Sequence, residues 1–311
     1  MSDLKKHVEE LFKFSRELTG PGFNQALDYI GKHIPLGIHQ WEPGEKIWTW
    51  VVPDNGLRIG EYTTNGGTDG TIILPIHLDH PRMANDNLSG VVVAMELINQ
   101  LQDYNLRHTY KFLFLPETIG TMAWLSRFGT SYKYGIVVDS VGTSGELVST
   151  FTKTPSILNN YLSGKVNTFL SEDHLMTGND ERALESVGIP SIHLTRAPFN
   201  EYHSELDTPD IVKEEQLVDT VKYMVSLIKR IELDYIPKPR YEGVPCLSAM
   251  GLWCKEYEVP ENFIKIERIW HLLTYDLSIS EIAIQTRLPF DYVYNFVEKL
   301  RDKGIIWSGK T

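Results

Sequence analysis

The chain has 311 residues, of which 42% are hydrophobic and 23% are charged, and its formal net charge is -11. This length and composition predict a globular protein with one sizeable α/β domain and a smaller appendage. The negative charge disfavours non-specific binding to nucleic acid or anionic lipid, since both depend on a positive field. The N-terminus has no apolar signal core and no stretch is long enough to span a bilayer, so we expect a cytoplasmic protein without a membrane partner.

The cysteine content restricts the kind of metal site that the chain can build. Cys246 and Cys254 are the only cysteines, and they are not in a Cys-x-x-Cys pair. Neither a disulfide framework nor a thiolate zinc site is predicted. Any metal ion is therefore expected to be held by His and carboxylate side chains.

The N-terminal quarter predicts two helices and then two strands. Apolar residues recur on one helical stripe from Leu4 to Leu18, and a second helical segment runs from about Phe23 to His33. Two β-like runs follow, Glu45 to Pro53 and Leu57 to Tyr62. Core or edge packing, with no functional role, is expected for three tryptophans of this region, Trp41, Trp48 and Trp50.

From Thr71 onward, strands and helices alternate. The apolar run from Thr71 to Pro75 predicts a buried strand, and the segment 91–98 predicts the start of a helix that reaches about Gln102. Further strands are expected at Thr109 to Leu115, Gly135 to Asp139 and Pro190 to Leu194, and a further helix at Ile119 to Phe128. This alternation predicts a mixed, mostly parallel central sheet with helices on both faces.

Polar side chains follow four of these strands. His77 and Asp79 come at the end of the first strand, Glu117 follows the second, and Asp139 ends the third. The fourth strand leads into a segment that contains His203. Because the carboxyl ends of parallel strands lie along one edge of a sheet, we expect these side chains to converge. Imidazoles and carboxylates in a short loop after a buried strand are costly to leave unpaired, which predicts a metal ion.

Each of these residues also has a simpler interpretation. A single loop histidine such as His77 is most often a hydrogen-bonded or surface residue. Asp86, which lies between two asparagines before a helix, is typical of a helix cap, and Glu117 is typical of a carboxylate in a first helical turn. Asp139 is typical of a residue that begins a turn. Only the ordered occurrence of all these residues at strand ends makes the metal site the favoured interpretation.

Five motifs follow one another along the chain: His77-x-Asp79, Asn85-Asp86-Asn87-x-Ser89-Gly90, Glu117-x-x-Gly120, Val138-Asp139-Ser140-Val141-Gly142, and His203 before Asp207-Thr208-Pro209. This order resembles that of the co-catalytic zinc aminopeptidases. Five more segments resemble a bacterial aminopeptidase-like branch associated with polysaccharide biosynthesis: Thr19-Gly20-x-Gly22, His80-Pro81, Pro116 to Gly120, Asp180-Glu181-Arg182 and Glu201-Tyr202-His203. The resemblance covers almost the whole chain and implies a zinc-exopeptidase, phosphorylase/hydrolase-like α/β domain.

The resemblance implies a role for each matching residue. Asp86 would bridge two zinc ions, His77 and Asp139 would complete the protein ligands of one ion, and His203 would serve the other. Glu117 would be the general base that takes a proton from metal-bound water. The implied activity is that of a metallo-aminopeptidase-like hydrolase, which cleaves a peptide or amide bond.

Position 118 departs from the family pattern. The family has a second acidic residue there, which ligates the other metal, whereas this chain has Thr118, a poor zinc ligand. Three outcomes remain open: one catalytic metal, a weak and exchangeable second site, or a second ion completed by another residue, namely His80, Glu181 or Glu201. We favour a site for two ions because Asp86 and His203 are both present. Zinc is the expected metal, with cobalt or manganese as substitutes.

Other polar residues are expected to act around the metal. The resemblance implies that Asp79 accepts a hydrogen bond from the His77 ring and fixes its tautomer. An aminopeptidase also requires a carboxylate for the ammonium group of its substrate and a group that stabilises the oxyanion. The candidates are Glu181 or Glu201 for the first role and Tyr202 or Arg182 for the second. The alternative for Asp180-Glu181-Arg182 is a solvated first turn of a helix.

The composition changes beyond about Leu233. We expect a catalytic domain over residues 1–233, a proline-containing linker over residues 234–259 and a small domain over residues 260–311. Helical segments at Asn262 to Tyr275, Ser280 to Thr286 and Asp291 to Arg301 predict a winged helix-turn-helix. The last helix begins with aromatic and acidic residues, which disfavours DNA contact and favours a packing or homo-oligomerisation surface.

Two other functions are kept as alternatives to peptide hydrolysis. The first is an amidohydrolase that acts on an amino sugar or another non-peptide amide in polysaccharide or natural-product metabolism, as the association of the branch implies. The second is a metal-degenerate regulatory or binding protein that acts through its winged helix, which the threonine at position 118 favours. In the enzyme interpretations the partner is a small peptide or amide substrate.

Overall fold

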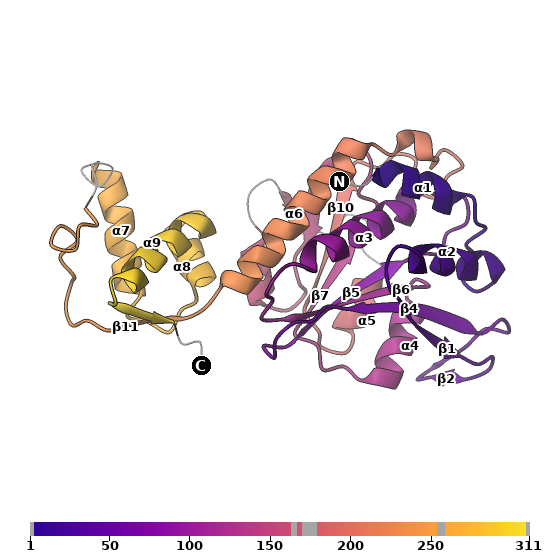
Figure 1. Cartoon of the computed structure of the whole chain (residues 1–311), viewed down its shortest axis with the longest axis horizontal. Helices are drawn as coiled ribbons and strands as arrows, with labels where there is room; N and C mark the ends of the chain where they lie inside the picture. The colour runs from indigo at the N-terminus through magenta and orange to yellow at the C-terminus, as the bar shows by residue number, and fades with distance from the viewer. Residues whose placement is uncertain (1–2, 163–166, 170–178, 254–258, 309–311) are drawn as a thin grey trace. The chain divides into compact units, whose positions relative to one another are not determined.

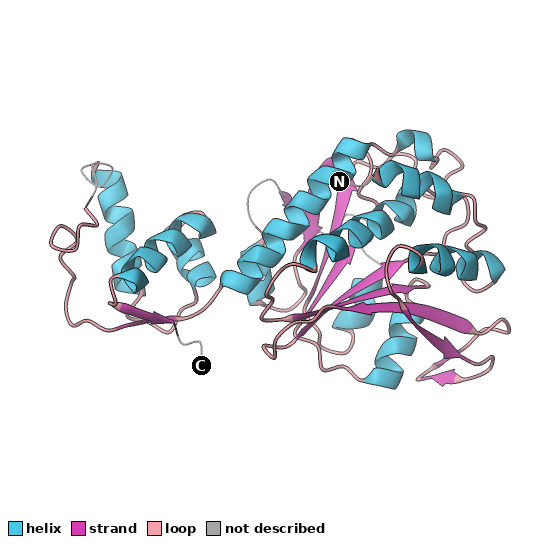
Figure 2. Cartoon of the chain, in the orientation of Figure 1, coloured by secondary structure: helices cyan, strands magenta, loops and turns pink. Residues whose placement is uncertain are grey.

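The chain forms two compact units. A computed structural model describes residues 3–162, 167–169, 179–253 and 259–308. One unit comprises Met1–Asn159 and Lys165–Ser226, and the second comprises Asn160–Gly164 and Leu227–Thr311. We call them the sheet unit and the C-terminal unit; Figures 1 and 2 show their helices and strands. Cys254 and the end of the predicted linker, residues 254–258, lie outside the described residues.

Two helices begin the sheet unit. α1 covers Leu4–Phe12, with its N-terminus capped by the Asp3 side chain, and α2 covers Pro21–Gly31. α1 ends six residues before the predicted end at Leu18, so that prediction is wrong in its last turns. The physical reason is Arg16, whose guanidinium is fully buried against backbone carbonyls of a distant loop, which a continued helix would not allow.

The centre of this unit is an eight-stranded mixed sheet in the order β1-β4-β6-β5-β7-β10-β8-β9. The strands are β1 Gly37–Trp41, β4 Leu57–Thr63, β5 Thr71–His77, β6 Thr109–Leu115, β7 Tyr134–Val138, β8 Glu146–Thr150, β9 Asn167–Phe169 and β10 Ser191–Ala197. The pairs β5–β6, β5–β7, β7–β10 and β8–β9 are parallel, whereas β1–β4, β4–β6 and β8–β10 are antiparallel. The predicted mixed α/β fold with a mostly parallel sheet is confirmed.

A small hairpin replaces the strand that was predicted at Glu45 to Pro53. β2 covers Lys46–Ile47 and pairs antiparallel with β3, which covers Trp50–Val51. The chain turns at Trp48, whose φ of 50° is in the left-handed region. Trp41 is buried in the core, as expected, but Trp48 and Trp50 are 46% and 43% exposed. The hairpin therefore presents two indole rings to the surroundings.

Helices cover both faces of the sheet, as predicted. Figure 1 shows α1, α2, α3 (Gly90–Leu101) and the first part of α6 (Glu214–Leu233) on one face. α4 (Ile119–Phe128) and α5 (Asp180–Glu185) lie on the other face. Three short helical segments complete this part of the chain: η1 Asn85–Ser89, η2 Ile157–Tyr161 and η3 Pro209–Ile211.

The register of the parallel strands determines where their polar ends meet. His77 of β5 pairs with Leu115 of β6, and Val138 of β7 pairs with Leu194 of β10. The residues that follow β5, β6 and β7 therefore come together at one edge of the sheet, where open α/β sheets carry their sites.

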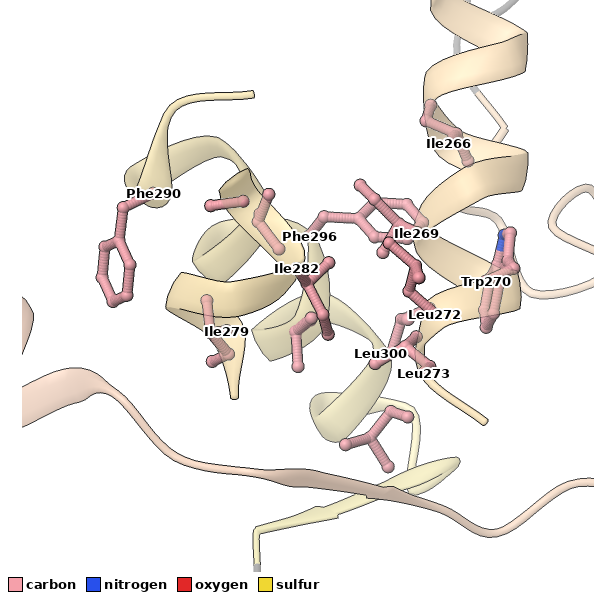
Figure 3. Packing of buried hydrophobic residues seen from close by; sticks show 14 of the residues in the cluster. Ile266, Ile269, Trp270, Leu272, Leu273, Ile279, Ile282, Phe290, Phe296 and Leu300 are labelled. Atoms are coloured by element: carbon pink, nitrogen blue, oxygen red, sulfur yellow. The ribbon is translucent and has the colours of Figure 1, made fainter. Parts of the chain in front are cut away.

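The C-terminal unit has its own hydrophobic core. It contains α7 (Pro260–Leu272), α8 (Ile279–Thr286) and α9 (Phe290–Asp302), with an antiparallel pair formed by β11 (Pro237–Pro239) and β12 (Ile306–Ser308). Figure 3 shows Ile269 and Trp270 of α7 facing Phe296 and Leu300 of α9 across this core. Ser278 starts α8 with a capping box completed by Glu281. Among the described helices, none has the length and apolar character required to cross a membrane.

Candidate metal centre

The loop after β5 is closely attached to the end of β7. The Asn87 side chain donates to the Val138 carbonyl (3.0 Å) and accepts from the amides of Gly90 (3.0 Å) and Ser140 (3.2 Å). A Cβ atom at position 90 would lie 2.3 Å from the Val138 oxygen, so only glycine permits this close approach. These contacts hold η1, which contains Asp86, beside Asp139.

Asp86 lies between two imidazoles. Its Oδ1 is 2.9 Å from His77 Nε2, and its Oδ2 is 3.1 Å from His203 Nε2. Asp139 Oδ1 is 3.8 Å from His77 Nε2. The structure thus brings together the four residues expected to bind metal, and one carboxylate presents a separate oxygen to each of two histidines.

His80 lies next to this group and also next to Glu117. The ligand atoms of His77, His80 and Asp86 all lie within 4.8 Å of one another, and so do those of Asp79, His80 and Glu117. His80 Nε2 is 3.5 Å from Glu117 Oε2, and the His80 and His203 rings are 5.4 Å apart. His80 is therefore the residue that links the two groups.

Asp79 and the His77 ring have different partners from those expected. Asp79 Oδ1 accepts the backbone N–H of Glu117 at 2.9 Å, and no hydrogen bond from His77 to Asp79 occurs among the described residues. The amide nitrogen of Asn179 lies 3.4 Å from His77 Nδ1 and donates to Asp139 Oδ2 at 3.0 Å. Asp79 lies beyond the end of β5, so its carboxylate reaches the start of the next connection and orients the backbone of Glu117.

Thr118 has an unusual backbone conformation. Its φ of 59° and ψ of −62° are rare for a β-branched residue and store strain at the start of α4. The Thr118 amide donates to Asp180 Oδ1 at 2.9 Å, and the Thr121 hydroxyl donates to the same oxygen at 2.7 Å. Asp180 is fully buried, and burial raises its pKa to about 7. The structure therefore places Asp180 behind Thr118, where it holds the backbone.

His193 is a buried residue of the centre that the sequence interpretation did not include. It lies on β10, with Nε2 3.5 Å from Asp139 Oδ2 and Nδ1 3.7 Å from Glu181 Oε2. Burial lowers its pKa, but Asp139 and Glu181 outweigh that effect and raise it. A histidine in an otherwise apolar predicted strand was the available signal. His193 connects Glu181 to Asp139, so Glu181 lies behind the centre.

Two buried charged residues from other parts of the chain form hydrogen bonds with the backbone of the loop between β5 and α3. The carboxylate of Asp207 accepts the backbone N–H groups of Ala84 (3.1 Å), Asn85 (2.6 Å) and Asp86 (3.0 Å). The guanidinium of Arg16 donates to the carbonyls of Leu78 (2.9 Å), His80 (2.8 Å) and Met83 (2.7 Å). Asp207 appeared in the sequence only as part of a motif, and Arg16 only as part of a predicted helix.

The electrostatics differ between Asp86 and Glu117. Burial opposes ionisation of Asp86, but hydrogen bonds from His203 and His77 hold its pKa far below the usual value. Burial lowers the pKa of His77, yet Asp139 and Asp86 outweigh it and raise that pKa well above the ordinary value. Burial raises the pKa of Glu117. The pKa of Glu117 is thus shifted in the opposite direction to that of Asp86.

This donor set fits a metal such as zinc. Imidazole nitrogens and carboxylate oxygens are the ligands that zinc takes when thiolates are absent. Asp86 and Asp139 are ionisable groups with almost no exposure to solvent, and such groups require a compensating cation. The buried side chains therefore favour a bound divalent cation over an empty polar cluster.

The remaining residues expected to bind substrate lie at different depths. The Tyr202 ring stacks on His203 at 3.9 Å, and burial raises the pKa of Tyr202 to about 12, so its hydroxyl stays protonated. Glu201 is half-buried, and its backbone carbonyl accepts from the Ser204 hydroxyl at 2.7 Å. Arg182 is exposed on α5 and lines a cavity that also contacts Thr118.

Comparison with known proteins agrees with this fold. A family model described as a domain of unknown function, DUF4910, matches residues 5–234. A Clostridium acetobutylicum protein, provisionally named a polysaccharide biosynthesis protein with an aminopeptidase-like domain, is 25% identical over 72% of this chain and 76% of its own.

One of three similar solved structures covers nearly the whole chain, and the other two cover about three quarters of it. A protein from C. acetobutylicum, provisionally named a peptidase, has a TM-score of 0.83 and 21% identity over 98% of this chain and 96% of its own. An Acidobacteriales bacterium glutaminyl cyclase has a TM-score of 0.59 and 16% identity over 74% of this chain and 94% of its own. A Zn-dependent exopeptidase from Parabacteroides distasonis has a TM-score of 0.57 and 15% identity over 73% of this chain and 96% of its own.

Proposed function

Because the chain belongs to the DUF4910 family and shares the fold of zinc exopeptidases, we propose that it is a metal-dependent amide hydrolase of the aminopeptidase type. The observation that carries the proposal is the position of Asp86, which presents one carboxylate oxygen to His77 and the other to His203. A bridging carboxylate between two imidazoles is what a two-ion site requires.

The proposed ligands divide into two groups that share Asp86. His77 and Asp139 would hold one ion, and His203 and His80 would hold the other. His80 would take the place of the acid that is missing at position 118, because its ligand atom lies within 4.8 Å of that of Asp86 and its ring centroid is 5.4 Å from that of His203. Bound zinc would supply Lewis acidity toward a carbonyl oxygen and toward water.

The side chains around the ligands would carry the proton transfers. Glu117 would take the proton from the attacking water and deliver it to the departing amine, since burial raises its pKa toward neutrality. Asp79 would keep Glu117 in place through the Glu117 backbone N–H. The Tyr202 hydroxyl is protonated and stacked on His203, so it is suited to donate to the developing oxyanion. Glu201, next to it, is the proposed partner for the substrate ammonium.

The decisive experiment compares Glu117→Gln with the natural protein on a panel of aminoacyl anilides in the presence of zinc, cobalt or manganese. We expect kcat to fall about 10²- to 10⁴-fold while the bound metal per chain is unchanged, because Glu117 is a base and not a ligand. Glu205→Gln, which changes an exposed carboxylate two residues after His203, is the matched control and should keep full turnover. Normal turnover by Glu117→Gln would refute the assignment.

Two related reactions are tested on the same centre. The glutaminyl cyclase of similar fold suggests a second reaction, in which the substrate's own amine attacks its side-chain amide, the carbon–nitrogen bond of that amide breaks and ammonia leaves. Glutaminyl peptides would then show cyclisation with release of ammonia in place of hydrolysis. The polysaccharide association of the Clostridium relative suggests an acylated amino sugar as substrate. An N-acyl hexosamine series in the same panel distinguishes this substrate class from peptides.

We further propose that the C-terminal unit is a winged helix that serves homo-oligomerisation. α9 carries the exposed Tyr292 near its start and has the acidic Asp291 in its first turn, whereas a DNA-reading helix favours Arg and Lys. Sedimentation of the full chain tests the oligomer. A salt-dependent shift of duplex DNA by the full chain would favour the regulatory alternative.

A further inference from the structure

A cavity of about 560 Å³ in the sheet unit is lined by residues of α4 and α5. The lining contains Thr118, which precedes α4, Met122 of α4, Trp50 of the β2–β3 hairpin, and Lys153. α5 and the turn after it supply further lining residues, including Arg182 and Glu185. Because Thr118 directly follows Glu117, one lining residue of the cavity is the sequence neighbour of the proposed general base.

The lining combines an apolar surface with a positive charge. Trp50 is 43% exposed and offers an indole face, and Met122 adds a flexible apolar side chain. Glu185 Oε1 accepts a hydrogen bond from the Lys153 backbone N–H at 2.8 Å, and Glu185 Oε2 is 3.8 Å from Lys153 Nζ. The Lys153 ammonium group is therefore paired with a carboxylate. Arg182 has no ion pair among the residues that the structure describes.

One unpaired guanidinium thus remains in the cavity of a chain whose formal net charge is -11. A single positive charge matches a monoanion better than a dianion such as a phosphate ester. A guanidinium binds a carboxylate with two parallel hydrogen bonds, which a point charge does not do. The indole and the thioether would cover the carbon atoms that carry the carboxylate.

We propose that this cavity receives a carboxylate-bearing group of the substrate and that Arg182 binds the carboxylate. The inference rests on the proposed amide hydrolysis and adds a substrate class to it. The carboxylate belongs either to an acidic side chain next to the scissile amide or to an acidic sugar ring. A cavity of about 560 Å³ has room for each.

Turnover is measured first, with the metal-loaded full chain on glutamyl and glutaminyl anilides. We expect kcat/KM for the glutamyl substrate to exceed that for the glutaminyl substrate by roughly 10- to 100-fold, the range for hydrogen bonds to a charged group. Arg182→Gln should bring this ratio close to one, and Arg182→Lys should retain part of it. Lys32→Gln, an exposed surface cation on α2's C-terminal side, should leave the ratio unchanged.

Binding without turnover separates this inference from the proposed function. Calorimetric titration of the Glu117→Gln protein with L-glutamate, L-glutamine and D-glucuronate, before and after Arg182→Gln, gives the affinities directly. Tighter binding of glutamate identifies an acidic side chain, and tighter binding of glucuronate identifies an acidic sugar. A glutamyl preference that survives Arg182→Gln, or no Arg182-dependent binding of either anion, would overturn the inference. Arg182-dependent binding by a protein that hydrolyses no amide would preserve it and refute the hydrolase.

Discussion

His80 is the single residue whose role decides the metal content. Thr118 departs from the pattern that the family resemblance implies, and its hydroxyl is a poor zinc ligand. His80 lies within reach of Asp86 on one side and of Glu117 on the other. We therefore expect a ring nitrogen of His80 to supply the donor that position 118 lacks.

Replacement of His80 by alanine tests this role. The natural protein is expected to bind two zinc ions per chain and His80→Ala one, because one ion would keep only Asp86 and His203. Metal analysis after gel filtration gives the count, and His271→Ala, an exposed histidine of α7, is the control. Two tightly bound ions in His80→Ala would exclude His80 as a ligand.

Asp180 offers a test of pH dependence at a residue outside the ligand set. Burial raises its pKa to about 7 in the folded state, against a usual value near 3.8. The folded protein then binds more protons than the unfolded chain between about pH 4 and 7, so the contribution of Asp180 to stability decreases as pH rises through this window.

Asp180→Asn should remove this dependence. Asn Oδ1 can accept from the Thr118 amide and the Thr121 hydroxyl, as Asp180 Oδ1 does. We expect equal free energies of unfolding near pH 4 and a variant that is more stable than the natural protein at pH 8, by up to about 4 kcal/mol. Urea unfolding of both metal-free proteins at the two pH values measures the difference. A difference that is independent of pH would contradict the raised pKa.

At the scale of elements, the β5–α3 loop depends on two distant side chains. Arg16 reaches three loop carbonyls after α1 ends, and Asp207 reaches three loop amides after β10. Burial lowers the pKa of Arg16 to about 10, so the guanidinium still carries its charge at neutral pH. The loop conformation is thus set by partners outside the loop.

Arg16→Met should weaken the metal centre without a change in any ligand. Loss of the guanidinium leaves the carbonyls of Leu78, His80 and Met83 without their donor, which costs about 2–4 kcal/mol of stability. Zinc affinity should fall at least about 10-fold, as for other residues that orient ligands. Arg16→Lys should also be impaired, since an ammonium lacks the planar fork. Arg268→Met, at an exposed arginine of α7, is the control for competition with a zinc chelator.

The convergence of polar residues at the strand ends could be predicted from the sequence. Parallel strands bring their carboxyl ends to one edge of the sheet, whatever their detailed register. That rule predicted that His77, Asp139 and His203 come together, whereas the place of Asp86 among them was implied by the family resemblance; in the structure all four lie close together. The predicted helix over Leu4 to Leu18 failed because the amphipathic pattern carries no information about the partner of Arg16. The predicted strand over Glu45 to Pro53 failed because propensity does not reveal a turn at Trp48.

The contacts of the buried residues of the centre could not be predicted from the sequence, because they depend on how distant segments pack. His193 lies 54 positions after Asp139 in the sequence, and the two side chains meet only because β10 pairs with β7. Asn179 reaches Asp139 from the start of α5. The prediction of a hydrogen bond from His77 to Asp79 was wrong for the same reason, since the Asp79 carboxylate accepts the backbone N–H of Glu117. Such contacts follow from the tertiary fold.

At the scale of the whole molecule, the two units have separate cores and only one contains the metal centre. Every ligand named above belongs to the sheet unit, whereas Ile269 and the other residues shown in Figure 3 belong to the C-terminal unit. A ligand stabilises only the unit that binds it when the units unfold independently.

Metal removal should therefore act on one thermal transition. Calorimetry of the full chain is expected to show two transitions, of which one moves down by roughly 10 °C when a chelator is added. Ile269→Ala, a buried position of the C-terminal core, should lower the other transition and leave the metal-dependent one in place. A single transition that shifts as a whole in both experiments would show that the units unfold together.

The contacts of Arg16 and Asp207 with the β5–α3 loop also determine when the loop can fold during synthesis. Arg16 leaves the ribosome before the loop does, but Asp207 follows Asp86 by 121 residues. In a nascent chain that ends before His203, three backbone amides of the loop lack their acceptor, Asp207, and His203 is also missing. The loop can therefore reach its final conformation only late in translation, since contacts between segments so far apart in sequence form slowly and close the fold. Loading of the metal centre then reports that the sheet unit has been completed.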